Sequence, residues 1–313
     1  MMLLRSMLFV PGNNMRMIAK AVTVPADAII FDLEDAVPII DKTTARIIVR
    51  DSIGVFETAG LNVFVRLNAL TTKITEEDIR FVAIKGLDGV VLAKTESGSD
   101  ILALQSMLEK AEKDKGLETG SINIIPQLES AKGIINAYDI ATAAERVIGV
   151  AFGSGDYYRD LGRSVGSWSP DQIELLYARC HIVNASVAAG VQPIDTVFFG
   201  LLTDKEGFIR ETRMVMRLGF KGKLLIHPSQ IEAANEILSP SSEETEHARR
   251  LVAAFEEAQE KGLGAISFEG KMVDYMNYTQ AKELVEQDEL VHANEERRLK
   301  SDDSRLFRFF IGH

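Results

Sequence analysis

Eight short apolar runs, rich in Val, Ile, Leu and Phe, lie between residues 6 and 226 and alternate with longer amphipathic stretches. Each run is apolar almost throughout, which is typical of a strand that is buried on both faces of a parallel sheet. Eight alternating strand–helix units favour a closed (β/α)8 TIM barrel, an α/β fold. We expect the strands at residues 6–10, 28–33, 62–67, 89–94, 122–128, 147–152, 195–199 and 223–226.

An open, doubly wound parallel sheet is the alternative fold for this pattern. The chain has no Gly-x-Gly-x-x-Gly motif after its first strand and no Gly-Lys-Ser/Thr phosphate loop. The glycine-rich run at residues 153–155 fails the dinucleotide pattern, because Tyr158 stands where the third glycine belongs. The barrel is therefore the preferred prediction.

The alternation of apolar strands and amphipathic helices ends after residue 238. A Ser- and Pro-rich linker follows there and precedes a charged helix expected over residues 243–261. A Gly-Leu-Gly break follows, and a second helix is expected over residues 271–289. These features divide the chain into a barrel domain of residues 1–238 and a C-terminal extension of residues 239–313. The extension ends in an aromatic strip, Leu306 to Phe310, which we interpret as a packing surface.

The 313-residue chain is acidic, with 35 Lys and Arg against 46 Asp and Glu and a net charge of −11. This balance argues against a general nucleic-acid-binding protein, which needs a basic face. An anionic substrate would need a local group of cations, or a metal ion, to bind against the overall field. No stretch is long and apolar enough to span a bilayer, and the single cysteine, Cys180, permits no internal disulfide, so we expect a soluble, cytoplasmic protein.

Charged residues directly follow, or end, several of the apolar runs. The carboxyl ends of the strands meet at one mouth of a (β/α)8 barrel, where enzymes with this fold place their active sites. We therefore expect one site built from Glu34 and Asp35 after the second strand, Arg66 in the third, Lys94 at the end of the fourth, Glu129 after the fifth and Asp156 after the sixth.

Carboxylates without a cluster of His or Cys indicate a hard divalent cation bound through oxygen, rather than zinc. Glu129 and Asp156 are one strand–helix unit apart, so they would lie on adjacent strands and could bind one Mg²⁺. Glu34 and Asp35 could hold waters around that ion, although an ordinary helix cap or turn explains them equally well. Arg66 lies within an apolar strand, where a charge needs a partner.

Five sequence motifs, at residues 5–12, 32–37, 65–68, 128–133 (Leu-Glu-Ser-Ala-Lys-Gly) and 151–156, occur in the order found in a known family. Over residues 5–290 the chain resembles the HpcH/HpaI aldolase/citrate lyase family, which includes citrate lyase beta subunits and the malyl-CoA and citramalyl-CoA lyases. Two positions depart from the pattern that is common there. Gly155 stands where an acidic residue often precedes the metal-binding Asp, and Ala93 stands where Pro often precedes the strand-four Lys.

The resemblance implies a (β/α)8 barrel that forms a trimer or a dimer of trimers and cleaves a 3-hydroxyacyl thioester with Mg²⁺ as cofactor. It implies that Glu129 and Asp156 are the metal ligands and that Arg66 binds the substrate carboxylate and oxygen. Asp274, in the C-terminal extension, resembles an acid/base residue that a neighbouring subunit places over the site.

The resemblance also implies that Glu34 and Asp35 order waters around the metal, and Lys94 completes our set of substrate-binding residues. The substrate is then a citryl thioester of CoA or of an acyl carrier protein, which yields oxaloacetate and an acetyl thioester. Malyl-CoA or citramalyl-CoA cleavage, thioester hydrolysis and aldol cleavage of free oxo acids stay open with the same site. A non-catalytic subunit or ligand sensor within a lyase complex is the alternative from a different class.

Overall fold

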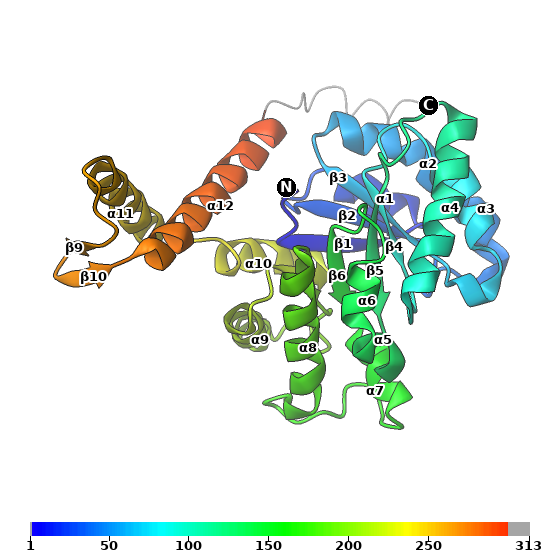
Figure 1. Ribbon diagram of the computed structural model, residues 1–313. Coiled ribbons are helices and arrows are strands. Elements are labelled where there is room, and N and C mark those ends of the chain that lie inside the picture. The colour runs from blue at the N-terminus through cyan, green and yellow to red at the C-terminus, as the bar shows by residue number, and fades with distance from the viewer. Residues whose placement is uncertain (1, 300–313) are drawn as a thin grey trace.

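The computed structural model, shown in Figure 1, describes residues 2–299. Eight parallel strands form a closed barrel in sequence order, and β8 pairs with β1 to close it. This arrangement confirms the (β/α)8 prediction over the open sheet. The strands are β1 (Ser6–Pro11), β2 (Ala28–Asp32), β3 (Asn62–Leu67), β4 (Gly89–Leu92), β5 (Asn123–Leu128), β6 (Gly149–Phe152), β7 (Gln192–Asp195) and β8 (Gly222–Leu225).

Helices cover the outside of the barrel. Their ends follow ordinary capping rules; before α4, for example, Ser97 and Asp100 form a capping box, and Gly116 ends the helix in the left-handed conformation. The helices are α1 (Met15–Ala21), α2 (Lys42–Thr58), α3 (Thr75–Val82), α4 (Gly98–Lys115), α5 (Ala131–Ile135), α6 (Ala137–Ala141), α7 (Ser154–Asp160), α8 (Ile173–Ala189), α9 (Lys205–Leu218) and α10 (Ile231–Ile237), with short 3-10 turns η1 (Ile39–Asp41), η2 (Leu70–Thr72) and η3 (Pro228–Gln230).

The barrel has two apolar cores, because side chains alternate between the two faces of each strand. Outward-facing residues pack against the helices in the larger core. Inward-facing residues, including at least one from every strand, form an apolar plug inside the barrel. The plug contains Met7, Ile30, Phe64, Val91, Ile125, Ala151, Ile194 and Leu224.

A polar layer lies directly above the apolar plug. Residues two positions after a plug residue point back into the barrel, and on β2, β3 and β5 these residues are Asp32, Arg66 and Gln127. Asp32 and Arg66 are also direct neighbours in the β2–β3 pairing. The strands therefore bring opposite charges together before any loop is considered.

The seventh strand differs from its prediction: β7 ends at Asp195, where the predicted strand begins. Asp195 is fully buried, and its carboxylate lies 2.9 Å from Arg179 Nε and 2.9 Å from Lys223 Nζ. The aromatic residues that suggested a strand instead pack from the following loop. Phe198 contacts Phe208 of α9, and its neighbour at position 199 packs on the indole at position 168.

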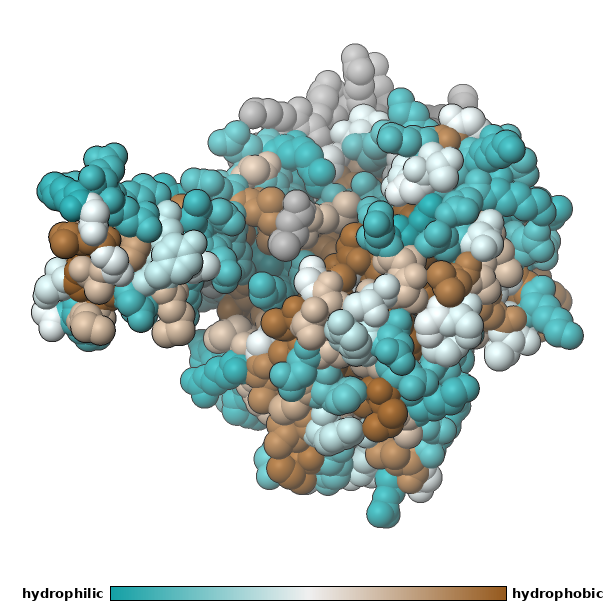
Figure 2. Space-filling view, in the orientation of Figure 1, coloured by the Kyte–Doolittle hydropathy of each residue, from teal (hydrophilic) through white to brown (hydrophobic). Residues whose placement is uncertain are grey.

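The C-terminal helices α11 (Ser242–Glu260) and α12 (Tyr275–Leu299), with the hairpin of β9 (Ile266–Phe268) and β10 (Lys271–Val273), have an apolar cluster of their own. Figure 1 and Figure 2 show this unit projecting to one side of the barrel. The end of α12 returns to the barrel, where Arg297 donates to Asn62 Oδ1 at 2.9 Å and Arg298 to the Val24 carbonyl at 2.6 Å. The aromatic strip Leu306 to Phe310 lies outside the described residues.

The predicted division at residue 238 falls in the connection between α10 and α11. The division of the chain into two domains at this point stays a prediction. Within residues 2–299, no helix is both long enough and apolar enough to cross a membrane.

Candidate active site

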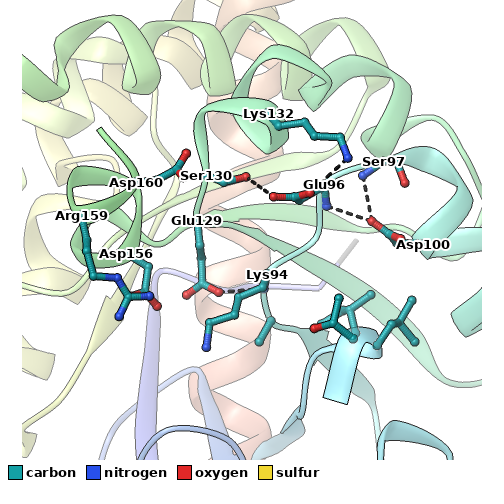
Figure 3. A pocket seen from close by; sticks show the side chains of 14 residues that line it. Lys94, Glu96, Ser97, Asp100, Glu129, Ser130, Lys132, Asp156, Arg159 and Asp160 are labelled. Atoms are coloured by element: carbon teal, nitrogen blue, oxygen red, sulfur yellow. Dashed lines mark hydrogen bonds and ion pairs between the residues drawn. The ribbon is translucent and has the colours of Figure 1, made fainter. Parts of the chain in front are cut away.

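A cavity of about 700 Å³ opens beside the carboxyl ends of β4, β5 and β6 (Figure 3). This volume lies within the range of small-molecule binding sites in proteins. Three of the predicted site residues, Lys94, Glu129 and Asp156, line the cavity. The full lining is Leu70, Thr71, Leu92, Ala93, Lys94, Glu96, Ser97, Asp100, Glu129, Ser130, Lys132, Asp156, Arg159 and Asp160.

Glu129, directly after β5, is buried and held from two sides. Its Oε2 accepts a hydrogen bond from the Lys94 backbone N–H at 2.7 Å, and its Oε1 accepts from the Gln127 side-chain amide at 2.8 Å. Gly153 lets the side chain pass close to the backbone after β6, because a Cβ at that glycine would lie 2.5 Å from Glu129 Cγ. The carboxylate is thus fixed at the inner end of the cavity.

Burial raises the pKa of Glu129 to about 8. The positive charge of Arg66 opposes this shift, whereas the neighbouring carboxylates of Glu34 and Asp156 add to it. Ionised Glu129 is therefore destabilised unless further positive charge is present. A divalent cation beside the carboxylate would supply that charge.

Lys94 connects Glu129 to the carboxylates that follow β2. Its φ angle of 53° lies in the left-handed region, which residues other than glycine rarely adopt. While the backbone N–H of Lys94 donates to Glu129, its Nζ donates to Glu34 Oε1 and lies 3.4 Å from Asp35 Oδ1. Burial alone would lower the pKa of Lys94, but its hydrogen bond to Glu34 and the nearby negative charge raise it, so the ammonium stays charged.

The guanidinium group of Arg66 forms two hydrogen bonds with the carboxylate of Asp32 on the neighbouring strand. Nε donates to Asp32 Oδ1 at 2.8 Å and Nη2 to Oδ2 at 2.6 Å, while the guanidinium carbon lies 4.7 Å from the centre of the Phe9 ring. Nη1 is 3.5 Å from Glu34 Oε2. The partner that a charge in a buried strand requires is therefore Asp32, and the Nη1 edge of Arg66 faces the other site residues.

Asp156 lies in the first turn of α7, on the opposite side of Glu129 from Lys94 (Figure 3). Its Oδ1 is 2.9 Å from Nη2 of Arg159, and its side chain is 21% exposed. Asp156 is thus accessible from the cavity, whereas Glu129 is enclosed. The two carboxylates come from adjacent strand–helix units, as the sequence predicts.

Two predicted site residues lie at the edge of this arrangement or outside it. The Asp35 side chain is 59% exposed. Asp274 lies between β10 and α12 on the projecting unit, where its Oδ1 accepts hydrogen bonds from the Met276 and Asn277 backbone N–H groups at 3.0 and 3.2 Å. The cavity of the same chain has no contribution from Asp274.

Two buried residues that contact the predicted ones have no assigned role in the sequence prediction. Asp32 clamps Arg66, and Gln127 donates to Glu129. The two-residue alternation along β2 and β5 is the signal that could have identified both, because it places them on the same inner face as the other site residues.

The donor set fits a magnesium ion. The carboxylates of the site outnumber its cations, and carboxylate oxygens are the ligands that hard cations prefer. The carboxylates are Asp32, Glu34, Asp35, Glu129 and Asp156, and the cations are Arg66, Lys94 and Arg159. Among residues 2–299, no group of three or more His, Cys, Asp or Glu side chains lies close enough together to bind a metal ion by itself. Water and substrate would have to complete the coordination, as is usual for Mg²⁺.

Comparisons with known proteins identify the family. The model of the HpcH/HpaI aldolase/citrate lyase family matches residues 5–228. The chain belongs to this family. Membership places it among carbon–carbon lyases and confirms the resemblance carried by the sequence motifs.

Individual relatives differ in the reaction that their names state. The citrate lyase subunit beta of Leuconostoc mesenteroides subsp. cremoris is 42% identical over 270 residues, which cover 86% of this chain and 88% of the relative. A (3S)-malyl-CoA thioesterase of Cereibacter sphaeroides is 32% identical over 289 residues, covering 92% of this chain and 96% of the relative. The crystal structure of CitE from Mycobacterium tuberculosis, in complex with magnesium, acetoacetate and coenzyme A, has a TM-score of 0.70 and 30% identity, covering 91% of this chain and 97% of that chain.

Proposed function

We propose that this chain is a Mg²⁺-dependent lyase that cleaves a 3-hydroxyacyl thioester of the citryl type into a 2-oxo acid, such as oxaloacetate, and an acetyl thioester. The observation that carries the proposal is the meeting of Glu129, Asp156 and the clamped Arg66 at one barrel mouth. The similarity to a citrate lyase subunit beta supports the choice of substrate, and the magnesium-bound relative supports the choice of ion.

Glu129 and Asp156 would hold the ion, and Glu34 and Asp35 would hold waters around it. Bound Mg²⁺ supplies Lewis-acid polarisation of the substrate hydroxyl and its neighbouring carboxylate. Arg66 donates N–H groups to that carboxylate and stabilises the negative charge that develops on the substrate oxygen. Lys94 adds a second fixed positive charge at the edge of the cavity.

The cleavage is a retro-Claisen reaction. Transfer of the hydroxyl proton to solvent water allows the bond between the hydroxyl-bearing carbon and the carbon next to the thioester to break. The hydroxyl-bearing carbon becomes the carbonyl of the 2-oxo acid, and the electron pair passes to the thioester as an enolate. A proton added to the enolate carbon completes the acetyl thioester.

We assign this last proton to the partner subunit's Asp274, because Asp274 lies outside the cavity of its own chain. The residues around it support a role between subunits. Met272, Tyr275 and Met276 are 80%, 63% and 70% exposed, although they are apolar or aromatic. Large exposed apolar groups of this kind mark association surfaces, so we propose that the chain works as an oligomer, with the extension capping a neighbouring site.

The test is a screen of purified full-length protein with citryl-CoA, malyl-CoA and citramalyl-CoA in the presence of Mg²⁺. The proposal expects formation of a 2-oxo acid from the citryl thioester, and loss of this activity in excess EDTA. Full activity in excess EDTA would contradict the metal assignment. Absence of turnover with every thioester, despite binding, would favour a non-catalytic subunit or ligand sensor.

Thioester hydrolysis is the second candidate function, because a (3S)-malyl-CoA thioesterase matches 92% of the chain. The two reactions differ in their products. Hydrolysis releases a free thiol and the intact hydroxy acid, whereas cleavage leaves the thiol acylated and yields the 2-oxo acid. Measuring thiol and oxo acid in one reaction separates the two functions.

A further inference from the structure

Gln127 carries a polar amide at a buried position inside the barrel, directly above the apolar plug. It lies on β5, two residues after Ile125 of the apolar plug and two before Glu129. The residue is 4% exposed, and its neighbour across the β5–β6 pairing is Ala151. One end of its amide is used, because Nε2 donates to Glu129 Oε1 at 2.8 Å.

The other end of the Gln127 amide has no partner. Its Oε1 is buried and accepts no hydrogen bond in the described part of the chain. A buried acceptor without a donor lowers the stability of the fold, and an apolar residue of the same size would avoid this penalty. Fold stability therefore gives no reason for an amide at position 127, whereas the bond to Glu129 does.

The bond from Gln127 completes the restraint on the Glu129 carboxylate. The terminal torsion of a Glu side chain is soft, so one hydrogen bond leaves the carboxylate free to turn about that bond. Lys94 holds Oε2 and Gln127 holds Oε1, so the two donors together fix the plane of the group. The close approach of Gly153 on the side chain limits movement of the stem as well.

We propose that Gln127 is a positioning residue, whose Nε2–H fixes the Glu129 carboxylate in the orientation that binds the divalent cation. This inference rests on the metal site of the proposed function. Groups that orient a metal ligand typically change metal affinity by ~10–100-fold when they are removed. The bond becomes charge-assisted when the cation binds, because the cation requires the ionised carboxylate as its ligand.

The test measures binding of Mn²⁺ alone to the full-length protein, from the electron paramagnetic resonance signal of the free ion. Gln127→Met keeps the side-chain volume and removes the donor. The matched control is Ile125→Met, which changes the same face of the same strand one layer lower and has no polar contact with Glu129. The proposal expects the Mn²⁺ dissociation constant to rise ~10–100-fold for Gln127→Met and to stay within about twofold of the wild type for Ile125→Met.

Thermal unfolding of the metal-free protein separates positioning from support of the fold. Gln127→Met also removes the unpartnered acceptor, so its unfolding temperature should not fall below that of Ile125→Met while its metal affinity falls. Wild-type affinity in Gln127→Met would overturn the proposal. If that variant does not fold, Gln127→Asn decides, because its amide is one methylene shorter and cannot reach Glu129 Oε1; the proposal expects the same loss of affinity, and wild-type affinity would overturn it.

Glu129→Ala is measured in the same series to separate this inference from the proposed metal site. If the wild type does not bind Mn²⁺, or Glu129→Ala binds it as well as the wild type, the site itself is wrong, and the positioning role falls with it. If Glu129→Ala loses binding and both folded Gln127 variants keep it, only the positioning role is wrong.

Discussion

Glu129 and Asp156 differ in their surroundings, although we assign them one task. Glu129 is enclosed and held by two donors, whereas Asp156 is partly exposed and paired with Arg159. Replacing either residue by Ala should abolish Mg²⁺-dependent cleavage and leave the fold intact, because neither side chain belongs to an apolar core. Oxo-acid formation and far-ultraviolet circular dichroism check the two parts of this prediction. Appreciable Mg²⁺-dependent turnover in either folded variant would remove that residue from the set of ligands.

Asp32 clamps the guanidinium of Arg66 and also accepts hydrogen bonds from the backbone N–H groups of Glu34 and Ala36, at 2.8 and 3.1 Å. The variant Asp32→Asn tests how much this carboxylate contributes to catalysis. Asn keeps the shape and one acceptor but removes the charge that clamps the guanidinium. A hydrogen bond to a charged group contributes ~1.5–3 kcal/mol, so kcat/KM should fall by about 10- to 100-fold. Steady-state kinetics over a range of substrate concentrations measures the change.

The chain offers a matched control for Asp32→Asn. Arg5 and Asp27 form a second bidentate pair, with Nε and Nη2 each donating at 2.8 Å, away from the cavity. Asp27→Asn should lower the free energy of unfolding and leave KM unchanged. Equal kinetic effects of the two variants would mean that Asp32 supports the barrel as a whole rather than Arg66 in particular.

The sequence predicts charged site residues better than the residues that hold them. Arg66 stands out because a charge in an apolar strand needs a partner, yet Asp32 becomes that partner only when the β2–β3 register is known. Gln127 carries no charge, so composition gives no signal for it. Its role depends on a contact with Glu129 that only the folded strand creates.

At the scale of elements, a buried ionic cluster joins β7, β8, α8 and α9. Lys223 donates to Asp195 at 2.9 Å and to Glu211 at 2.7 Å, and Arg179 donates to Asp195 from the other side. This cluster explains the error in the seventh strand. The sequence pattern predicts Asp195 as the polar start of an apolar strand, whereas its two buried partners hold it at the carboxyl end of β7.

The same cluster predicts how stability depends on pH. Burial alone would raise the pKa of Asp195, but the charges of Arg179 and Lys223 outweigh burial and hold the pKa below its ordinary value. The native state therefore binds fewer protons than the unfolded state in acid. The stability that this carboxylate contributes is fully present above its unfolded pKa of about 4 and is lost as the pH falls through the lowered native pKa.

Asp195→Asn tests this dependence. Removing one partner of a buried ion pair typically lowers the free energy of unfolding by ~3–5 kcal/mol, because the other charge stays buried. We expect that loss at pH 7 and a smaller difference from the wild type below about pH 4, where the carboxyl of Asp195 takes up a proton in the unfolded state while it stays ionised in the native state. Urea unfolding of both proteins between pH 7 and pH 3 measures it. A difference that stays constant over this range would contradict the lowered pKa.

At the scale of the whole molecule, two properties bear on the site: the acidic net charge of the chain, and the absence of the C-terminal helices from the cavity lining. The net charge of −11 argues against binding an anion, yet the clustered carboxylates need a cation, which then supplies the missing positive charge. Within the described part of the chain, residues 239–299 also contribute nothing to the lining of the cavity. The barrel and the two long helices of the C-terminal unit were predictable from local patterns, although residues 271–273 of the helix expected over residues 271–289 form β10, and α12 begins at Tyr275. The proposed placement of Asp274 over the site of a second chain depends on contacts between chains, which no local pattern encodes.

Complementation between inactive variants tests the shared site. Glu129→Ala has an intact Asp274, and Asp274→Ala has an intact metal site, so each protein alone should be folded and inactive. Mixed oligomers contain sites in which the barrel of one variant meets the C-terminal unit of the other. With random mixing of equal amounts, about one quarter of the sites combine both intact parts and should regain activity.

The mixture must exchange subunits, so the two proteins are mixed in mild denaturant and then diluted, and each variant treated alone is the control. Recovery of cleavage activity in the mixture, and in neither control, is the expected result. A second mixture, of Glu129→Ala with Asp156→Ala, should stay inactive, because both changes lie in the barrel and no pairing of chains restores the metal site. If Asp274→Ala alone turns over normally, or if the first mixture stays as inactive as the second, Asp274 does not reach a neighbouring site and the extension has a packing role instead.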